Sequence, residues 1–267
     1  MSKSASRRAS QARAQHKRGA RRVSVVGVFG ELLVTAGVLI LLFVGWQLYW
    51  NDMVIAKQQK NDAIALTEKW AKQASPPKAS APETAVPEMP VGPQAPPVQA
   101  APSADASKFA ILYIPRFGND YRRTIVQGVD KPTVLDVGNV GHYKKTQMPG
   151  DIGNFVVAAH RSNYGGGMHV NQLQMGDPIF VQTSDGWYTY RFRNLEYVQP
   201  AKVNILQPVP GRDDTLPTER LISLTTCNPL HSTAERVSAY GVFDSFRATA
   251  AGPPAEVAAI LSASGGR

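Results

Sequence analysis

The sequence predicts a mainly β domain, an antiparallel barrel or sandwich with short helices, behind one N-terminal transmembrane helix. Three observations lead to this fold class. A long uncharged apolar run lies near the N-terminus, and a proline-rich stretch separates it from the rest of the chain. The region beyond contains short runs rich in β-branched and aromatic residues, without a repeated alternation of strand and helix patterns.

The basic charge of the chain belongs to its first residues. The 267 residues carry a net charge of +9, and eight lysines or arginines without any acid fall within residues 1–22. Residues 108–248 contain 15 basic and 12 acidic side chains, which leaves a net charge of +3. A nucleic-acid-binding domain would carry a stronger basic surface. We therefore interpret residues 1–22 as a basic tail and expect no nucleic-acid partner.

Residues 23–50 form the predicted transmembrane anchor. The run from Leu32 to Trp50 is uncharged, and it is long enough to cross roughly 30 Å of hydrocarbon as a helix. Because the basic tail lies upstream, the positive-inside rule places the N-terminus in the cytoplasm and the remaining chain outside the cell. A cleaved signal peptide is the alternative. We disfavour it because the run is too long and no clear small-residue cleavage site follows.

Two segments connect the anchor to the domain. Residues 51–74 contain good helix formers and could continue the membrane helix as a stalk. Residues 75–107 are rich in proline, so we expect a disordered or extended linker that reaches roughly 100 Å at most. At the other end of the chain, residues 249–267 are rich in alanine, glycine and serine and are expected to be disordered.

The domain itself is predicted to span residues 108–248. Seven runs have the composition of strands: residues 109–115, 154–160, 178–183, 187–192, 196–199, 220–226 and 237–243. Ser-Asp-Gly at 184–186 is a hairpin turn signal. Two further segments are predicted as short helices, residues 131–137 and 167–173.

Cys227 is the one cysteine of the chain, so it cannot form an intrachain disulfide. It directly follows the predicted strand 220–226, and Pro229 ends that strand because proline cannot donate to a β ladder. In an exported protein, an unpaired cysteine indicates either an intermolecular disulfide or a reactive thiol. A buried structural cysteine is the alternative, since free cysteine is among the most buried residue types.

A nucleophilic thiol needs a partner that raises its thiolate fraction or carries its proton. His160 is the preferred candidate, because it ends one apolar run as Cys227 ends another and two strand ends can meet at one rim of a barrel. Arg236, nine residues after Cys227, could face the thiol and stabilise an oxyanion. His16 belongs to the basic tail. The remaining histidines are interpreted as satisfied core or surface residues: His142, His169 and His231.

The segments NFVVAAHR and SLTTCNP, which contain His160 and Cys227, occur in this order with Arg236 behind an N-terminal anchor. This combination resembles the sortases. The interval from Cys227 to Arg236 and the segment WYTYRF are most similar to class E, the housekeeping type of actinobacteria. The resemblance covers about residues 109–246 and implies an eight-stranded sortase β-barrel.

The resemblance also implies a reaction. Cys227 would attack the Thr–Gly bond of an LPXTG-like sorting signal, often LAXTG in class E, near the C-terminus of an exported protein. An amine of the peptidoglycan precursor lipid II would resolve the acyl-enzyme and anchor that protein to the cell wall. His160 would be the general acid and base, and Arg236 would stabilise the oxyanion and position the peptide. Thr225 and Thr226 would line the peptide groove.

Other interpretations remain open. Asn228 stands where many relatives have histidine, which bears on peptide preference more than on activity. An L,D-transpeptidase is also a cysteine acyltransferase at the wall, but its Ser-x-Gly-Cys pattern does not match the residues before Cys227. A catalytically inert, wall-facing binding or scaffold barrel would be expected to bury that thiol. No metal-ligand spacing appears, so neither a metal nor another cofactor is expected.

Overall fold

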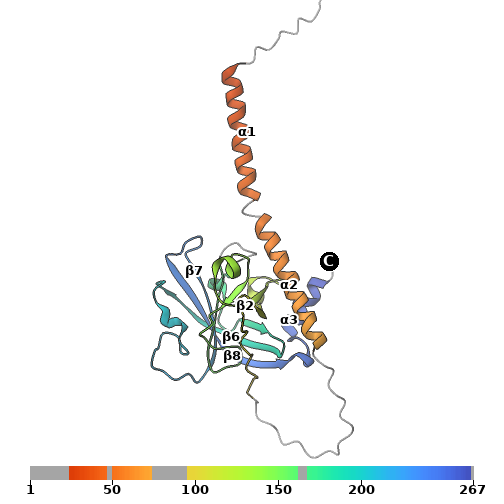
Figure 1. Ribbon diagram of the computed structural model, residues 1–267, viewed down its shortest axis with the longest axis vertical. Helices are drawn as coiled ribbons and strands as arrows, with labels where there is room; N and C mark the ends of the chain where they lie inside the picture. The colour runs from red at the N-terminus through yellow and green to blue at the C-terminus, as the bar shows by residue number, and fades with distance from the viewer. Residues whose placement is uncertain (1–23, 47–49, 74–94, 162–166, 266–267) are drawn as a thin grey trace, which may run out of the picture. The chain divides into compact units, whose positions relative to one another are not determined.

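The structure, a computed structural model, describes residues 24–46, 50–73, 95–161 and 167–265. The chain divides into two compact units, residues 1–46 and 47–267. The predicted basic tail and residues 75–94 of the predicted linker lie outside the described residues. The second unit contains the β domain with two helices, α2 (Asn51–Gln73) and α3 (Ala255–Gly265) (Figure 1).

The first unit contains helix α1 (Val25–Gly45), whose 21 residues include a single ionisable side chain, Glu31. The Ser24 hydroxyl accepts a hydrogen bond from the Gly27 amide at 3.4 Å, which satisfies one of the donors at the helix N-terminus. The helix has a mean hydropathy of 2.4. At 1.5 Å per residue it is about 31 Å long, close to the thickness of a bilayer's hydrocarbon core. Length and composition make α1 a candidate membrane span within the predicted range.

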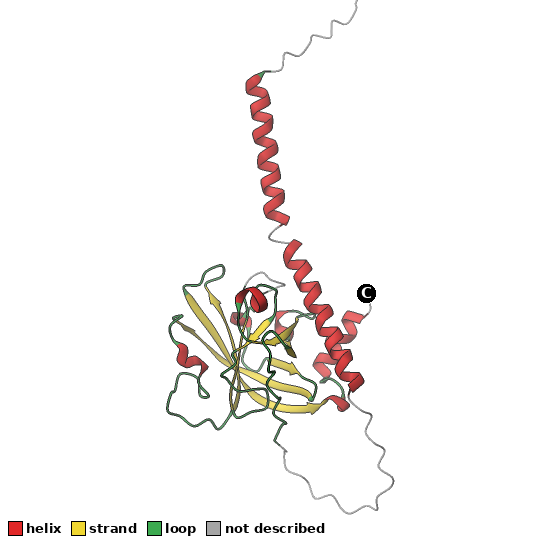
Figure 2. Ribbon diagram, viewed as in Figure 1, coloured by secondary structure: helices red, strands yellow, loops and turns green. Residues whose placement is uncertain are grey.

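Eight strands form a closed barrel in the order β1-β2-β3-β4-β7-β8-β6-β5 (Figure 2). The strands are β1 Lys108–Tyr113, β2 Arg122–Gln127, β3 Val140–His142, β4 Gly153–Ala158, β5 Pro178–Gln182, β6 Gly186–Val198, β7 Arg220–Asn228 and β8 Glu235–Ala248. Short helical turns occupy several connections: η2 Pro115–Phe117, η3 Lys131–Leu135, η4 Val170–Gln172, η5 Val203–Leu206 and η6 Thr249–Ala251. The predicted mainly β, eight-stranded fold is confirmed, and η3 and η4 fall within the two predicted helical segments.

Two pairings in the barrel are parallel, which corrects the expectation of an antiparallel sheet. β2 pairs with β3 and β4 pairs with β7 in parallel, whereas the other neighbouring strands run antiparallel. Parallel neighbours require a crossover, because the connection must return to the starting end of the sheet. η3 lies in the first crossover, and the β5–β6 hairpin lies in the second.

The main hydrophobic core fills the barrel interior. Successive side chains of a strand point to opposite faces, so every second residue of β4 and β7 can enter this core. Phe155 and Val157 do so from β4, and Ile222 and Leu224 do so from β7. This alternation fixes which face of β7 carries each residue near the end of the strand.

Helix α2 packs against the outside of the barrel and is not a free stalk. Gln59, Ala63 and Trp70 lie along one face of the helix, and all three are buried. The last two belong to a second apolar cluster that contains the strand residues Ile111, Tyr113, Phe180 and Trp187. The predicted helix at 51–74 is therefore present, and its amphipathic stripe explains why it lies on the barrel.

The C-terminal residues 249–267, expected to be disordered, instead contain η6 and α3. Val257 and Ile260 are buried, and Val257 joins the same outer cluster as Trp70, so α3 lies beside α2 (Figure 1). Leu261 packs against that cluster as well. The positions 257, 260 and 261 lie on one face of a helix, a signal that the alanine-rich composition obscured.

Residues 95–107, expected to belong to the linker, run along the barrel surface. The Tyr188 hydroxyl donates to the Pro97 carbonyl at 2.9 Å, and the Gln99 amide donates to the Pro149 carbonyl at 3.0 Å. Gly150 permits this close approach, because a Cβ there would lie 2.0 Å from the Pro97 oxygen. This end of the proline-rich segment is part of the folded domain, held by contacts that composition does not reveal.

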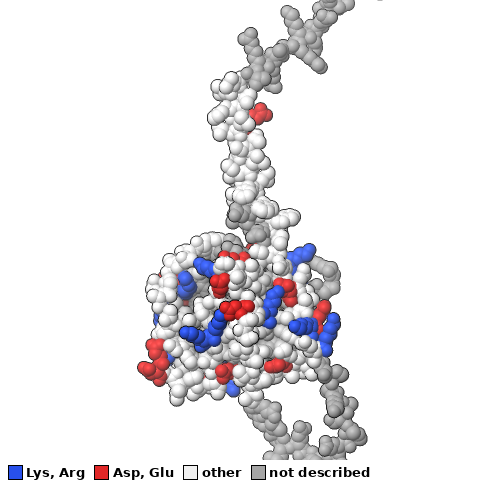
Figure 3. Space-filling model, viewed as in Figure 1, with Lys and Arg blue, Asp and Glu red and all other residues white. Residues whose placement is uncertain are grey.

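The barrel surface carries charges of both signs. On the face seen in Figure 3, Lys and Arg side chains are interspersed with Asp and Glu side chains. Exposed ion pairs include Arg193 with Glu219 and Lys202 with Glu196, both at 3.1 Å. Such pairs add only about 0–1 kcal/mol each to stability.

Candidate active site

Strands β7 and β8 bring Cys227 and Arg236 together. The two residues are directly opposite each other in the antiparallel register. Opposite residues in such a pair project from the same face of the sheet. Because Ile222 and Leu224 enter the core, Cys227 belongs to the outer face of β7. The register thus places the arginine beside the thiol on the outside of the barrel.

His160 reaches the same place from the end of β4. The parallel pairing sets Ala158 opposite Thr225, and the Ala159 amide donates to the Thr225 carbonyl at 3.3 Å. If this register is extended by two residues, His160 lies opposite Cys227. The crossover between β4 and β7 therefore allows two strand ends to meet at one rim, although 67 residues separate them in sequence.

All five site residues predicted from the sequence line one cleft of about 190 Å³: Cys227, His160, Arg236, Thr225 and Thr226. Cys227 is a free thiol and is half-buried, so it is accessible from the cleft. The two threonines are buried and belong to opposite faces of β7. The Ser238 hydroxyl donates to Thr225 Oγ1 at 3.0 Å, whereas Thr226 Oγ1 has no hydrogen-bond partner among the described residues.

Backbone carbonyls hold the Arg236 guanidinium. Its Nη1 donates to the carbonyl oxygens of Thr233 at 3.0 Å and Glu235 at 2.9 Å. Tyr143 lines the same cleft, and burial raises the pKa of its phenol. The positive charge of Arg236 lowers this pKa, and the negative charge of a Cys227 thiolate raises this pKa. Tyr143 thus lies within electrostatic reach of both residues. A guanidinium fixed beside a thiol can stabilise a thiolate and an oxyanion.

Asp136 is a site residue that the sequence analysis did not identify. It directly follows η3, and its Oδ1 lies 2.7 Å from Nε2 of His160. The His160 side chain is 22% exposed and that of Asp136 is 40% exposed, so water reaches the pair. The carboxylate fixes the orientation of the ring and would stabilise a positive charge on it. No sequence signal marks Asp136, because it lies in a short helical segment 24 residues before His160.

The Asn228 side chain links Arg161, which follows His160, to Glu235, which precedes Arg236. Arg161, which follows His160, donates from Nη1 to Asn228 Oδ1. The Asn228 amide in turn donates to Glu235 Oε2 at 2.8 Å. This bridge ties the chain just beyond β4 to the end of β7 and the start of β8, beside the cleft.

The other described histidines lie elsewhere. His142 is buried in the barrel, and burial lowers its pKa to about 4. His169 packs edge-on against Phe117, and burial lowers its pKa below the usual range. His231 lies in the exposed turn between β7 and β8. His16 is outside the described residues. Within the part of the chain that the structure describes, no group of three or more His, Cys, Asp or Glu side chains could hold a metal ion.

A cysteine with a histidine and an arginine at one rim of a closed barrel is an arrangement that can support acyl transfer through a thioester. Residues 112–243 match the family model of the sortase domain, and the chain belongs to the sortase family. The resemblance inferred from the segments around His160 and Cys227 is confirmed. Membership of this family removes the L,D-transpeptidase interpretation.

Relatives of the chain include class E sortases. Sortase SrtE1 of Streptomyces coelicolor is 33% identical over 232 residues, which cover 84% of this chain and 59% of that protein. The chain therefore matches less than two thirds of the length of this relative. The structure of sortase E1 from Streptomyces coelicolor with a tripeptide in the active site is 34% identical, with a TM-score of 0.54 over 57% of this chain and 97% of that one. The SrtA sortase from Actinomyces oris is 33% identical, with a TM-score of 0.57 over 61% and 93% of the two chains.

Proposed function

We propose that the chain is a membrane-anchored cysteine transpeptidase that cleaves an LAXTG- or LPXTG-like sorting signal between Thr and Gly. It transfers the new acyl group to an amine of a peptidoglycan precursor such as lipid II, which attaches the exported protein to the cell wall. The observation that carries this proposal is the convergence of Cys227, His160 and Arg236 in one cleft, from the ends of three strands.

In the acylation step, the Cys227 thiolate attacks the threonine carbonyl carbon and forms a C–S bond. The carbonyl electrons move onto oxygen, where the Arg236 guanidinium stabilises the negative charge. When the tetrahedral intermediate collapses, the C–N bond breaks. The protonated ring of His160 gives its proton to the departing glycine amine, and a thioester remains on Cys227.

The second step reverses these roles. The neutral ring of His160 takes a proton from the incoming amine as that amine attacks the thioester carbon. Collapse forms the new amide and expels the Cys227 thiolate. His160 is protonated again, so the starting state is restored and no outside oxidant, reductant or cofactor enters the balance.

A second hollow, of about 550 Å³, adjoins the cleft through Tyr143, which lines both. Its lining includes Val203 and Leu206 of η5. Val203 is 67% exposed, so an apolar surface is available beside the cleft. This hollow suits the leucine of the sorting signal, while Thr225 and Thr226 line the part of the groove next to the thiol.

The location follows from the first residues of the chain. α1 is long and apolar enough to cross a bilayer, and the basic residues that precede it favour a cytoplasmic N-terminus. The barrel would then work outside the cell. There the partners named above, exported proteins with C-terminal sorting signals and wall-precursor amines, are available.

A cleavage assay tests the proposal. The full chain in detergent micelles would be given fluorogenic LAXTG and LPXTG peptides, beside the variants Cys227→Ala, His160→Ala and Arg236→Ala. We expect cleavage at Thr–Gly that all three variants lose, and the ratio of the two peptide rates ranks the motifs. No cleavage, together with a Cys227 that resists a thiol-reactive probe in the folded chain, would overturn the proposal in favour of the inert barrel.

A further inference from the structure

Among the described side chains of α2, Gln59 is the one polar group that is fully buried, at 2% exposed. A buried amide is costly unless each of its ends finds a partner. Gln59 Nε2 donates to Asn139 Oδ1 at 2.9 Å and to the Val137 carbonyl at 3.2 Å. Its Oε1 accepts from the Thr124 amide at 3.3 Å. Both ends are satisfied, and every partner belongs to the barrel.

These contacts reach the segment that carries Asp136. Val137 and Asn139 lie in the connection between η3 and β3, and Asp136 directly precedes Val137. Asp136 in turn lies 2.7 Å from the ring nitrogen of His160. A continuous series of contacts therefore leads from α2, through Gln59 and one short connection, to the imidazole.

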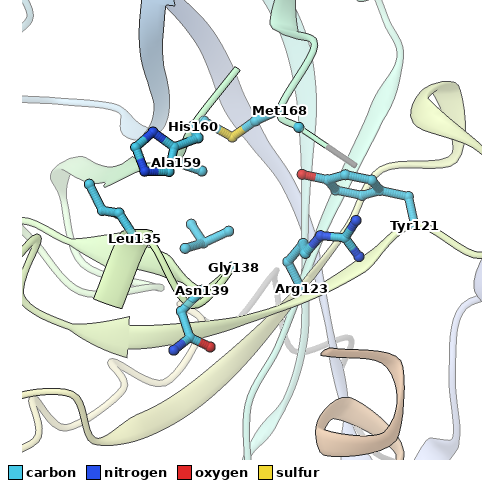
Figure 4. A pocket seen from close by; sticks show the side chains of 10 residues that line it. Tyr121, Arg123, Leu135, Gly138, Asn139, Ala159, His160 and Met168 are labelled. Atoms are coloured by element: carbon cyan, nitrogen blue, oxygen red, sulfur yellow. The ribbon is translucent and has the colours of Figure 1, made fainter. Parts of the chain in front are cut away.

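The connection has little room to shift. Leu135, Gly138 and Asn139 line a small pocket that His160 also lines, and the Asn139 amide points away from the imidazole (Figure 4). The volume of this pocket is only about 10 Å³, roughly the space of a single water molecule. In such tight packing, a displacement of the connection is transmitted to its neighbours.

We propose that α2 is a brace for the catalytic histidine, with Gln59 and Asp136 as positioning residues. Gln59 holds the connection, the connection holds Asp136, and the Asp136 carboxylate holds the His160 ring in the orientation that proton transfer requires. The proposal rests on the function proposed above, because it assigns His160 the role of acid and base. It also means that a fragment beginning at Lys108 would lack part of the catalytic apparatus.

The titratable side chains around His160 come from several elements. Lys131, Tyr143, Cys227 and Arg236 line the thiol cleft, and Tyr121 and Arg123 line the small pocket. Of these side chains only Lys131, Arg236 and Arg123 are cationic, and Asp136 supplies the carboxylate that the ring contacts. Loss of this carboxylate is therefore expected to affect the orientation and the charge of the ring together.

Kinetics of the full chain in detergent would test the proposal. Asp136→Asn is expected to lower kcat for peptide cleavage by about 10- to 100-fold with KM within twofold, since an oriented acid or base is typically worth 10²–10⁴-fold. Gln59→Ala should lower kcat less, by about 3- to 10-fold. The double variant should be no worse than Asp136→Asn alone, because both changes act on one group. Asp136→Glu, which keeps the carboxylate, should recover part of the loss.

Thr67→Val is the matched control. Thr67 also lies on α2 and donates to Gln182 Oε1 at 3.0 Å, but it does not touch the connection that carries Asp136. It should lower the thermal midpoint about as much as Gln59→Ala while leaving kcat unchanged. If both α2 variants change stability alone, or if the losses from Gln59→Ala and Asp136→Asn multiply, the proposed brace is wrong.

A spectroscopic readout separates this inference from the proposed function. An imidazole N–H that is bonded to a carboxylate gives a downfield proton resonance. In selectively histidine-labelled full chain we expect this resonance for His160 in the unaltered protein and in Thr67→Val. It should vanish in Asp136→Asn and shift or broaden in Gln59→Ala. If the unaltered chain cleaves no peptide, the proposed function fails. The resonance series still decides whether Gln59 positions the ring. An unchanged resonance in Gln59→Ala would refute the positioning role of Gln59.

Discussion

Two histidines on neighbouring strands occupy opposite environments. His142 ends β3, and His160 lies two residues beyond β4, the strand that pairs with β3. The His142 ring is 1% exposed, and its Nδ1 lies 2.7 Å from the Gln127 amide oxygen. The His160 ring lines an open cleft, and its Nε2 lies 2.7 Å from the Asp136 carboxylate.

The comparison teaches that the partner and the exposure of a histidine, and not the residue type, decide whether its ring is suited to proton transfer. Burial beside a neutral amide lowers the pKa of His142 to about 4, so its ring stays neutral at physiological pH and serves packing. His160 has a carboxylate partner and access to water, which are the surroundings that the proposed acid and base requires. His160 ends an apolar run, which marks it in the sequence, whereas His142 follows Gly141 in a segment without a strand pattern.

The largest expected effect comes from exchanging the two rings for asparagine. His160→Asn should lower kcat/KM for peptide cleavage by about 10²–10⁴-fold, because a general acid and base is lost, while the thermal midpoint stays nearly unchanged. His142→Asn should do the reverse, with kcat within twofold and a lower midpoint. Peptide kinetics and thermal unfolding of the same two variants check both statements. Equal losses of activity in the two would break the comparison.

The pH dependence of stability tests the His142 half of this comparison. Between about pH 6.5 and pH 4 the unfolded chain protonates His142 and the folded chain does not. The unfolded state thus binds more protons, so this contribution to the free energy of unfolding is complete above pH 6.5. It falls by about 2 kcal/mol on going to pH 5. Urea unfolding at pH 7 and pH 5 measures the change.

His142→Leu should flatten this dependence between pH 7 and pH 5, whatever its effect on stability at pH 7. His231→Ala is the control, because it removes an exposed imidazole and keeps the buried ring of His142 in place. A His142→Leu variant with an unchanged slope would show that another group, and not the buried ring, carries the effect.

The smallest effect distinguishes two threonines at the same rim. Thr225→Val should cost about 1–2 kcal/mol, because the buried Ser238 hydroxyl loses its acceptor. Thr226→Val should leave stability unchanged or raise it by up to about 1 kcal/mol, because Thr226 Oγ1 is buried and bonds to none of the described residues. If the peptide uses that hydroxyl, KM rises severalfold in Thr226→Val. A clear loss of stability in this variant would contradict the assignment.

The site residues that lie at the ends of predicted strands could be identified from the sequence. His160 and Cys227 each follow an apolar run, and Arg236 begins the next one, so their convergence needed only the closure of a barrel. Asp136 and Gln59 were not predictable. Their roles depend on packing between segments far apart in the sequence, and neither residue stands in a recognisable pattern.

The same distinction holds for the fold. Alternating apolar residues indicate strands but not their neighbours, so the parallel pairing of β4 with β7 was missed although both strands were expected. Composition misled at both ends of the domain. Alanine and serine around α3 concealed the apolar face formed by Val257 and Ile260, and proline before β1 concealed the hydrogen bonds of residues 95–107.

The barrel holds the chain both before and after the undescribed residues 74–94. α2 is fixed to the barrel as far as Trp70, and the chain is bound to the barrel again from Pro97 onward. For a chain tethered at two fixed points, each doubling of the length between them costs only about 0.6 kcal/mol. A reporter domain inserted between the two attachment points is therefore expected to cost little stability and to leave the cleft unaltered.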